Sequence, residues 1–369
     1  MKTANVFLNL KHILIFSGSI IAFMVGSAFA SGQEVLQYYT VYGLKGCILG
    51  GFVTFIIFYI TIKQVLTDSY HLRDKDSLKI FQHYCGKTLG TVYKWIVAVF
   101  IYLAYIVMLS GCGALFEEQL RLDAILGVFL IAVLTSVVVA MGMKRLTDIL
   151  GFLGPLLIIM ILIVSVLGLC MNLEGIAEAE KTLSALTLKK ASPYWWLSAV
   201  NYPCFALIGA YPFLFNIGSN CKTGEPRKIA LISCGFFVGT IIVMGLAMLG
   251  CLDKVYNLNI PIAYIADQII PGFGSIFAIV MFFGIFTTAV PLLWQSAHVF
   301  STNEHGRKYK CSVILLAAIG CIGAELPFAS LVNIIFPIQG YLGIFLVAVT
   351  IGKAFINCCI KLLYKIKHS

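Results

Sequence analysis

Long apolar segments follow one another along almost the whole chain, and short polar loops separate them. Most of these segments are long enough for a helix to cross the hydrocarbon core of a bilayer, which takes about 20 residues. Because backbone polar groups in lipid must find partners within the protein, spanning segments are expected to be helices. The pattern predicts an all-α membrane protein of about ten transmembrane helices, at residues 12–42 (interrupted), 44–66, 91–116, 123–143, 147–171, 195–218, 228–252, 271–299, 311–327 and 331–356.

The spans divide into two groups of five, because a long polar stretch, 172–194, separates the fifth span from the sixth. Five is an odd number, so the two halves enter the membrane from opposite sides, which is the topology of an inverted repeat. We predict one integral membrane domain over 1–369. It consists of a first repeat 1–171, an outer connection 172–194, a second repeat 195–356 and an amphipathic cytoplasmic tail 357–369.

Lysine and arginine are unequally distributed between the two sides of the predicted bundle. With the N-terminus inside, 20 of the 26 basic residues fall in inner segments and 6 in outer ones. Cytoplasmic loops carry the excess of positive charge, so both termini are predicted to be cytoplasmic. Charged residues make up only 11% of the chain, against about 25% in soluble domains. The net charge of +10 lies in loops between spans, which argues against a nucleic-acid-binding face.

The first span contains an unusual run of small residues. Six of them fall within 26–32, and Gln33 and Glu34 follow directly. Glycine lowers the cost of unwinding a helix, and unwound backbone at membrane depth occurs where it lines a cavity or is buried in protein. We therefore predict a break in this span.

The sixth span occupies the corresponding place in the second half and carries Asn201, Pro203, Gly209 and Pro212. Each proline removes a helix hydrogen bond. Paired interruptions at matched positions indicate a transporter's binding site, where half-helix ends offer N–H groups to a carboxylate and C=O groups to a cation. Spans one and six are thus both predicted to be discontinuous.

The N-terminus allows an alternative interpretation. Lys2 and Lys11, an apolar core and the sequence Ala28-Phe29-Ala30 before Ser31 are also typical of a secretory signal peptide. Cleavage after Ala30 would leave nine spans and would remove the symmetry of the two halves.

The segment Gly26-Ser-Ala-Phe-Ala-Ser-Gly-Gln-Glu34 resembles the Gly-Ala-Gly-Phe-Ala-Ser-Gly-Gln-Glu signature of the YkvI-like bacterial membrane proteins. That family is similar to the amino acid–polyamine–organocation superfamily, which has the LeuT-type fold. Ser27 replaces the alanine and Ala28 the second glycine of the signature, and Ala28 makes the turn less permissive. The resemblance implies a LeuT-like fold, a transport class and the bacterial cytoplasmic membrane, but no substrate.

The resemblance also implies a cation site. In LeuT-fold sodium-coupled transporters, a hydroxyl pair on the eighth span and three backbone carbonyls bind Na+. Carried over by position, the hydroxyls are those of Thr287 and Thr288, and the carbonyls are those of Ala22, Val25 and Gly284. Threonine in a membrane helix can also simply bond its own i−4 carbonyl.

Several residues near the two predicted breaks are candidates for binding a substrate. Glu34 could bind a substrate ammonium, carry a coupling proton, form a gate, or simply stabilise the start of a half-helix. Tyrosines on the third and sixth spans could form an aromatic wall. The candidates are Gly26, Ser27, Ala28, Ser31, Gly32, Gln33, Glu34, Tyr102, Tyr105, Asn201, Tyr202 and Gly209.

The predicted function is ion-coupled secondary transport of a small solute by alternating access, with an amino acid or amine-bearing metabolite as substrate and Na+ or H+ as coupling ion. The alternative is a membrane sensor or assembly protein that keeps the fold without transporting. No Gly-rich phosphate loop or zinc-type histidine spacing is present, so an enzyme is not expected. The expected partners are a small-molecule substrate and the lipid bilayer, with no cofactor apart from Na+.

Overall fold

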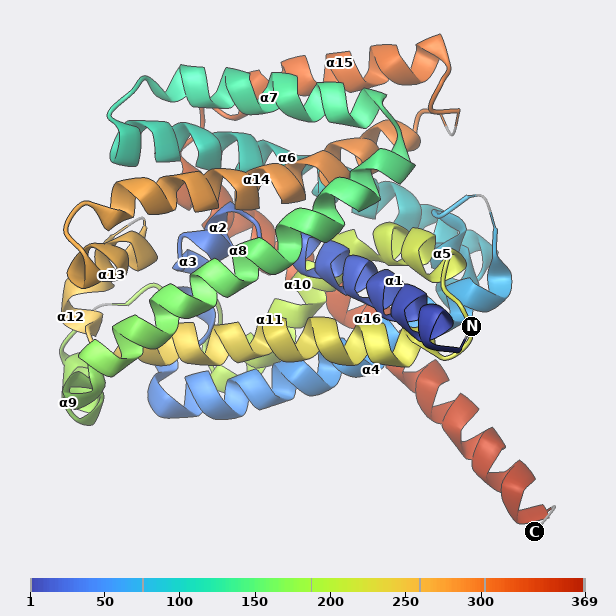
Figure 1. The fold of residues 1–369 in the computed structure, drawn as a ribbon, viewed down its shortest axis with the longest axis horizontal. Coiled ribbons are helices and arrows are strands. Elements are labelled where there is room, and N and C mark those ends of the chain that lie inside the picture. Colours follow the sequence, from blue (N-terminus) through green and yellow to red (C-terminus); the bar gives the residue numbers. More distant parts are fainter. Residues whose placement is uncertain (1, 75, 187, 259, 302, 368–369) are drawn as a thin grey trace.

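A computed structural model describes residues 2–74, 76–186, 188–258, 260–301 and 303–367. Within these ranges the chain is helical and has no strand (Figure 1). The elements are α1 (Lys2–Met24), α2 (Ser27–Ala30), α3 (Gln33–Tyr38), the 3-10 turn η1 (Thr40–Tyr42), the π-helix η2 (Lys45–Gly50), α4 (Gly51–Leu72), α5 (Lys79–Cys85), α6 (Lys87–Leu120), α7 (Ala124–Ala140), α8 (Met143–Met171), α9 (Leu173–Ala185), α10 (Trp195–Ser219), α11 (Glu225–Leu249), α12 (Leu252–Val255), α13 (Pro261–Ile269), α14 (Phe273–His298), α15 (Arg307–Gly323) and α16 (Phe328–Lys367).

Each predicted span is helical, and the first is divided among α1, α2 and α3. Six described segments are long and apolar enough to cross a membrane by themselves, and they lie in η2 with α4, and in α6, α10, α11, α14 and α16. Residues 155–171 of α8 join α9 at a bend of 83°, and the apolar helices 10–24 and 124–140 are shorter. With α15, these helices account for all ten predicted spans. The all-α membrane fold is therefore confirmed.

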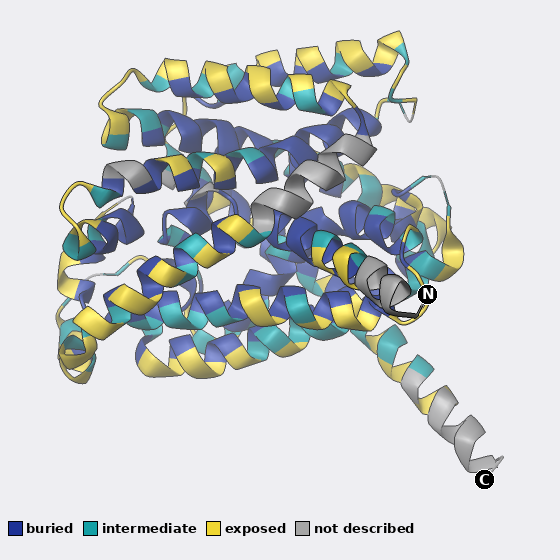
Figure 2. Cartoon of the chain, viewed as in Figure 1, coloured by how far each residue is buried: buried dark blue, intermediate teal, exposed yellow. Residues whose placement is uncertain are grey.

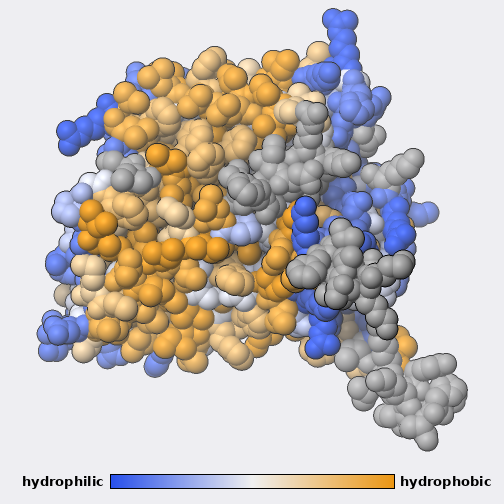
Figure 3. Space-filling model, in the orientation of Figure 1, coloured by the Kyte–Doolittle hydropathy of each residue, from blue (hydrophilic) through white to orange (hydrophobic). Residues whose placement is uncertain are grey.

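The helices form one bundle whose two ends carry most of the polar surface. Figure 1 shows α9, α12 and α13 at one end, and α5 with the starts of α1 and α11 at the other. The start of α1 and the end of α16 lie toward the same end. In Figure 3 the surface between the ends is largely hydrophobic, while hydrophilic residues gather at the two ends. This distribution fits a bilayer across the middle of the bundle.

The centre of the bundle is built around the first span. α1 packs against α8 and α11, α10 packs against α4 and α16, and α14 packs against α6. Figure 2 shows that the central helices are buried on most of their surface, whereas α7 and α15 expose one long side. The last part of α16 extends beyond the body (Figure 1), so the predicted tail continues this helix as far as Lys367 rather than starting a new element.

The first span is interrupted, as predicted. α1 ends at Met24, α2 begins at Ser27, and a second interruption at Ser31–Gly32 precedes α3. Gly32 has a φ of 87°, which favours glycine because L side chains rarely adopt it. The Ser31 carbonyl accepts a hydrogen bond from the Ile262 amide at 3.1 Å, so α13 supplies a partner that the interrupted helix lacks.

The sixth span is continuous, and the predicted break in it is wrong. α10 runs from Trp195 to Ser219 with Pro203 and Pro212 inside the helix. Pro203 leaves the Ala199 carbonyl without its helical donor, but the Thr54 hydroxyl donates to that carbonyl at 3.1 Å. A side chain of a neighbouring helix thus replaces the lost bond, which allows a proline to sit in a membrane helix.

Residues before Ala30 form part of the core, which bears on the alternative of a cleaved signal peptide. Ile20, Ala22 and Val25 are buried against the rest of the bundle. Cleavage would remove α1 and expose the apolar surfaces of α8 and α11 that it covers. We expect intact-mass spectrometry of the purified protein to find a chain that retains these residues. A mature chain beginning at Ser31 would contradict this prediction.

Candidate functional site

Oxygen atoms from α1 and α14 meet beside the break in the first span. The Thr287 hydroxyl donates to the Ala22 carbonyl at 3.1 Å and to the Gly284 carbonyl at 3.0 Å. The Thr288 hydroxyl lies 3.2 Å from the Ala22 carbonyl oxygen and 3.0 Å from that of Phe23. Both threonines are buried. Both hydroxyls bond to carbonyls of α1, and that of Thr287 also bonds within α14, so the pair links two helices.

The absence of a side chain at Gly284 brings α14 close to the break. A Cβ built there would lie 3.3 Å from the Val25 carbonyl oxygen and 3.3 Å from the Ala30 side chain. The carbonyl oxygen of Val25 therefore lies close to the backbone of Gly284, whose own carbonyl accepts from Thr287. The structure brings together the five residues predicted for a cation site, and adds the Phe23 carbonyl, which sequence reasoning missed.

This group of atoms fits Na+ chemically. All the donors are neutral oxygens, the ligand type that hard cations take, and the carbonyls at the end of α1 carry the negative end of its dipole. Among the described residues, no group of three or more His, Cys, Asp or Glu side chains could hold a metal ion. The candidate site therefore suits a weakly bound monovalent cation better than a transition metal.

A small central cavity lies directly beside these oxygens. Its volume is about 50 Å³, and it is bounded by α1, α3, α6, α10, α14 and α16. Ligand pockets usually measure about 300–1,000 Å³, so the walls must separate before a solute can enter. The lining residues are Phe23, Met24, Gly26, Glu34, Ala104, Met108, Phe205, Ala206, Gly209, Thr288, Leu292, Phe336 and Gln339.

Among the described residues that line the cavity, Glu34 is the one with an ionisable side chain. It lies in the first turn of α3 and is 4% exposed. The Tyr202 hydroxyl donates to its Oε2 at 3.0 Å. No cationic side chain forms an ion pair with it in the part of the chain that the structure describes. A carboxylate buried without a cation is costly, so a proton or a cationic ligand must neutralise it.

Gln339 on α16 is a second polar group at the cavity, and the sequence reasoning missed it. Its Nε2 donates to the Phe205 carbonyl at 3.2 Å. Its Oε1 is buried, and no described residue donates to it. An amide in the middle of an otherwise apolar span is the signal that could have identified it.

The two tyrosines predicted on α6 lie on the wrong side of that helix. The Tyr102 hydroxyl donates to the Leu316 carbonyl of α15 at 2.9 Å, and the Tyr105 hydroxyl pairs with the Thr135 hydroxyl of α7 at 3.1 Å. Ala104 and Met108, four residues apart on one helix face, line the cavity instead. Neither tyrosine is therefore part of the central cavity.

Three further candidates, Tyr202, Asn201 and Gln33, do not line the cavity but contact residues around it. Tyr202 contacts Glu34, as described above. Asn201 is buried between α10 and α16, where its amide donates to the Pro337 carbonyl at 3.4 Å. Gln33 donates to the Leu258 carbonyl and accepts from Gln37 at 3.0 Å, so it ties the first span to its neighbours.

The remaining candidates have small side chains or none. The Ser31 hydroxyl donates to the Ala28 carbonyl at 3.1 Å and accepts from the Gln33 amide at 3.3 Å. Ala28 is fully buried. Ser27 is the first residue of α2, and its side chain lies outside the described set. Gly26 and Gly209 both line the cavity.

One contact holds the first half of α1 against α11. His12 Nδ1 lies 2.9 Å from Glu225 Oε2, and the same oxygen accepts from the Lys222 amide at 2.7 Å. The Glu225 side chain is buried, whereas His12 is partly exposed. This pair is the kind of contact that must break if α1 moves away from the bundle.

Replacing His12 with alanine should therefore loosen α1. Partly exposed pairs of this kind contribute about 1 kcal/mol at most, so amide hydrogen exchange in residues 10–24 should quicken up to about fivefold. Exchange measured by mass spectrometry tests this, with the exposed neighbour Lys11→Ala as control. Equal exchange in His12→Ala and the control would contradict a restraining role.

Comparison with curated proteins finds two relatives of similar length, although no family model matches the chain. The membrane protein YkvI of Bacillus subtilis is 25% identical over 338 residues, covering 89% of this chain and 92% of the relative. YyaD of the same organism is 21% identical, covering 91% of this chain and 94% of the relative. The chain is a homologue of YkvI and YyaD. The resemblance inferred from the 26–34 motif is confirmed.

Solved structures show which fold this YkvI homologue has. MhsT, solved in complex with L-phenylalanine, superposes with a TM-score of 0.68 at 17% identity, covering 92% of this chain and 88% of MhsT. A Na+-coupled sialic acid symporter gives 0.59 at 13% identity, covering 92% and 78%. Mhp1, a nucleobase-cation-symport-1 family transporter, gives 0.58 at 13%, covering 85% and 71%. This chain thus has the LeuT fold.

Proposed function

We propose that this protein is a Na+-coupled secondary transporter of a small amine-bearing solute, either an amino acid or a related metabolite. It would act in the bacterial cytoplasmic membrane with both termini inside the cell. The fold supports this proposal, since the structurally similar MhsT was solved with L-phenylalanine and another similar structure is that of a Na+-coupled sialic acid symporter. Fold alone does not determine substrate or ion, so the proposal rests on the site.

The observation that carries the proposal is the position of Thr288. Its hydroxyl belongs to the oxygen cluster at the end of α1, and the same residue lines the central cavity. A cation at the cluster and a solute in the cavity would therefore share one residue. Such sharing provides a direct physical route for coupling the binding of the two ligands.

The chemistry of the cavity favours an ammonium group. Glu34 and the Oε1 of Gln339 are acceptors, and none of the described residues that line the cavity is Lys, Arg or His. The remaining wall is apolar and includes Met108, Phe205 and Phe336. An ammonium would neutralise Glu34, and an apolar side chain would pack against the aromatic rings. If Glu34 instead carries a proton in the transport cycle, H+ would replace or accompany Na+ as the coupling ion.

Uptake into proteoliposomes tests this function directly. The purified protein would be given a panel of labelled amino acids and the amines obtained from them by decarboxylation, with and without an inward Na+ gradient and, separately, a proton gradient. We expect at least one amine-bearing solute to accumulate only with the Na+ gradient. Accumulation driven by protons alone would reject Na+ coupling, and preference for anionic solutes would reject the role given to Glu34.

The continuity of α10 favours one alternative, a sensor that binds a solute without moving it. A transporter with a single interrupted span has fewer unwound segments to rearrange. In that case, an amine that raises the melting temperature of the purified protein would show no accumulation under any gradient. Binding together with accumulation would exclude the sensor.

A further inference from the structure

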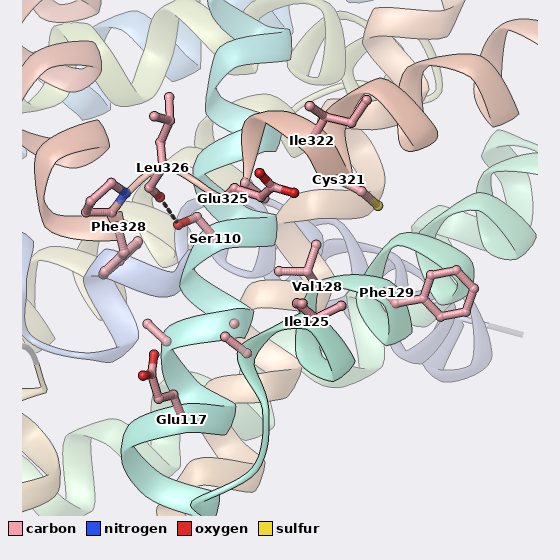
Figure 4. A pocket seen from close by; sticks show the side chains of 15 residues that line it. Ser110, Glu117, Ile125, Val128, Phe129, Cys321, Ile322, Glu325, Leu326 and Phe328 are labelled. Carbon is pink, nitrogen blue, oxygen red and sulfur yellow. Dashed lines mark hydrogen bonds between the residues drawn. The ribbon is translucent and has the colours of Figure 1, made fainter.

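A second and larger pocket lies away from the central cavity. Its volume is about 450 Å³, within the size range of sites for small organic ligands. It is formed by α6, the start of α7 and the turn from α15 to α16, and it shares no lining residue with the central cavity. Figure 4 shows Glu117 near one end and Glu325 beside the turn, with Ile125 and Val128 between them in this view.

Glu325 lies in the turn that joins α15 to α16. The Ser110 hydroxyl donates to the Leu326 carbonyl at 2.9 Å, so the turn that carries Glu325 lies level with Ser110 on α6 (Figure 4). Glu117 lies about 10 Å further along the same helix, nearer to its end at Leu120. α15 has 17 residues, about 25 Å, which is shorter than a hydrocarbon core of about 30 Å. A helix of this length that starts at one face of the bilayer would end about 5 Å before the other face.

The charge of this pocket is not balanced by the protein. Glu117 and Glu325 are both exposed, and neither forms an ion pair within the described residues. No Lys, Arg or His is among the described residues that line the pocket, and its walls include the exposed apolar side chains of Ile125, Phe129 and Ile322. An exposed carboxylate beside an apolar wall is complementary to a molecule that joins a positive charge to an apolar body.

We propose that this pocket binds an amphipathic organic cation, whose ammonium group pairs with Glu325 and whose apolar part packs between α6 and α7. Glu117, nearer the surface, would attract the cation on entry. The same chemistry could come from a free alkylamine or from the ammonium head group of phosphatidylethanolamine, and the test below separates these two sources.

A ligand in this pocket would contact helices that also line the central cavity. In α6, Ser110 lines this pocket and Met108 lines the central cavity. In α16, Phe328 lines this pocket and Gln339 lines the central cavity. The bond from Ser110 to Leu326 joins α6 to the turn that begins α16. An occupied pocket would therefore restrain α6 relative to α16.

Photolabelling of the full-length protein tests the site without knowledge of the transported solute. The protein would be placed in nanodiscs of phosphatidylglycerol and irradiated with an alkylamine that carries a diazirine, or with the matching alkyl alcohol as a neutral probe. Mass spectrometry would map the labelled peptides. We expect the amine to label peptides from 110–129 and 321–328 at least about threefold more than the alcohol does.

Variants and competition decide between the outcomes. Glu325→Gln should lower amine labelling about threefold and Glu117→Gln less, while the exposed carboxylate variant Glu178→Gln should leave it unchanged. In unmodified protein, excess unlabelled alkylamine should compete and the alcohol should not. Equal labelling by both probes, unaffected by the variants and by the competitors, would overturn the proposal and indicate a groove for any apolar chain.

The lipid composition of the nanodiscs separates the two sources of the cation. Loss of amine labelling in phosphatidylethanolamine nanodiscs would support the lipid head group as the ligand, and unchanged labelling would support the free amine.

Discussion

Replacing Glu34 with glutamine is expected to abolish uptake of an amine-bearing solute and to make the unliganded protein more stable. The carboxylate is buried with Tyr202 as its hydrogen-bond partner and with no cation paired to it in the described structure. Removing one partner of a buried charge pair costs about 3–5 kcal/mol, so binding of the ammonium should weaken by two orders of magnitude or more. A neutral amide avoids the cost of either protonating the buried carboxylate or leaving it charged in the empty protein, and the melting temperature should rise.

Two measurements separate these effects. Uptake into proteoliposomes reports the loss of function, and the melting temperature without solute reports the gain of stability. Glu174→Gln, which changes an exposed carboxylate on α9, is the matched control and should alter neither. Tyr202→Phe should cause a smaller loss of uptake, about tenfold, because it removes a neutral donor only. A Glu34→Gln variant that transports normally would show that the carboxylate does not hold the solute.

Replacing Thr288 with alanine is expected to abolish the Na+ dependence of the protein while leaving its expression intact. The hydroxyl is one of the oxygens gathered at the end of α1, and it bonds to the carbonyls of Ala22 and Phe23. Hydrogen bonds and ligands to charged groups contribute about 1.5–3 kcal/mol each, so the Na+ affinity should fall about tenfold or more. Thr288→Ser keeps the oxygen and should retain most of the affinity.

Stabilisation by the ion measures this affinity without a known solute. A ligand that binds the folded state raises its stability in proportion to the logarithm of ligand concentration over Kd. The melting temperature should therefore rise with NaCl, relative to KCl or choline chloride, in the unmodified protein and in Thr288→Ser but not in Thr288→Ala. Thr240→Ala is the control, because that buried threonine bonds the carbonyl of Phe236 in its own helix. An unchanged Na+ response in Thr288→Ala would reject the site.

Much of the fold could be predicted because membrane spans follow from length and hydropathy alone. The break in the first span was also predictable, since small residues and a carboxylate at 26–34 serve no purpose in a helix that faces lipid. The continuity of α10 was not. Whether Pro203 breaks a helix depends on the hydroxyl of Thr54, which comes from another helix and has no signal near the proline.

Residues of the candidate site could be predicted only where their position along the chain was sufficient to place them at the site. Gly26, Glu34 and Thr288 lie next to the break or were placed by the resemblance, and all line the cavity. Tyr102 and Tyr105 were misassigned because the face of a buried helix that points to a cavity depends on its rotation in the bundle. A span that is apolar all round gives no sign of this rotation. The neighbours Ala104 and Met108 occupy the favoured face.

The Thr288 hydroxyl lies within hydrogen-bonding distance of two carbonyls, those of Ala22 and Phe23, but it has a single hydrogen to donate. If a sodium ion occupies the cluster, the carbonyls turn to the metal and that hydrogen loses its acceptors. It can then point into the cavity, where a carboxylate of the solute would accept it. Each ligand would thereby raise the affinity of the other by the same factor, as linkage requires. An amine without a carboxylate would forgo this advantage, so its binding should depend on sodium less steeply than that of the parent amino acid.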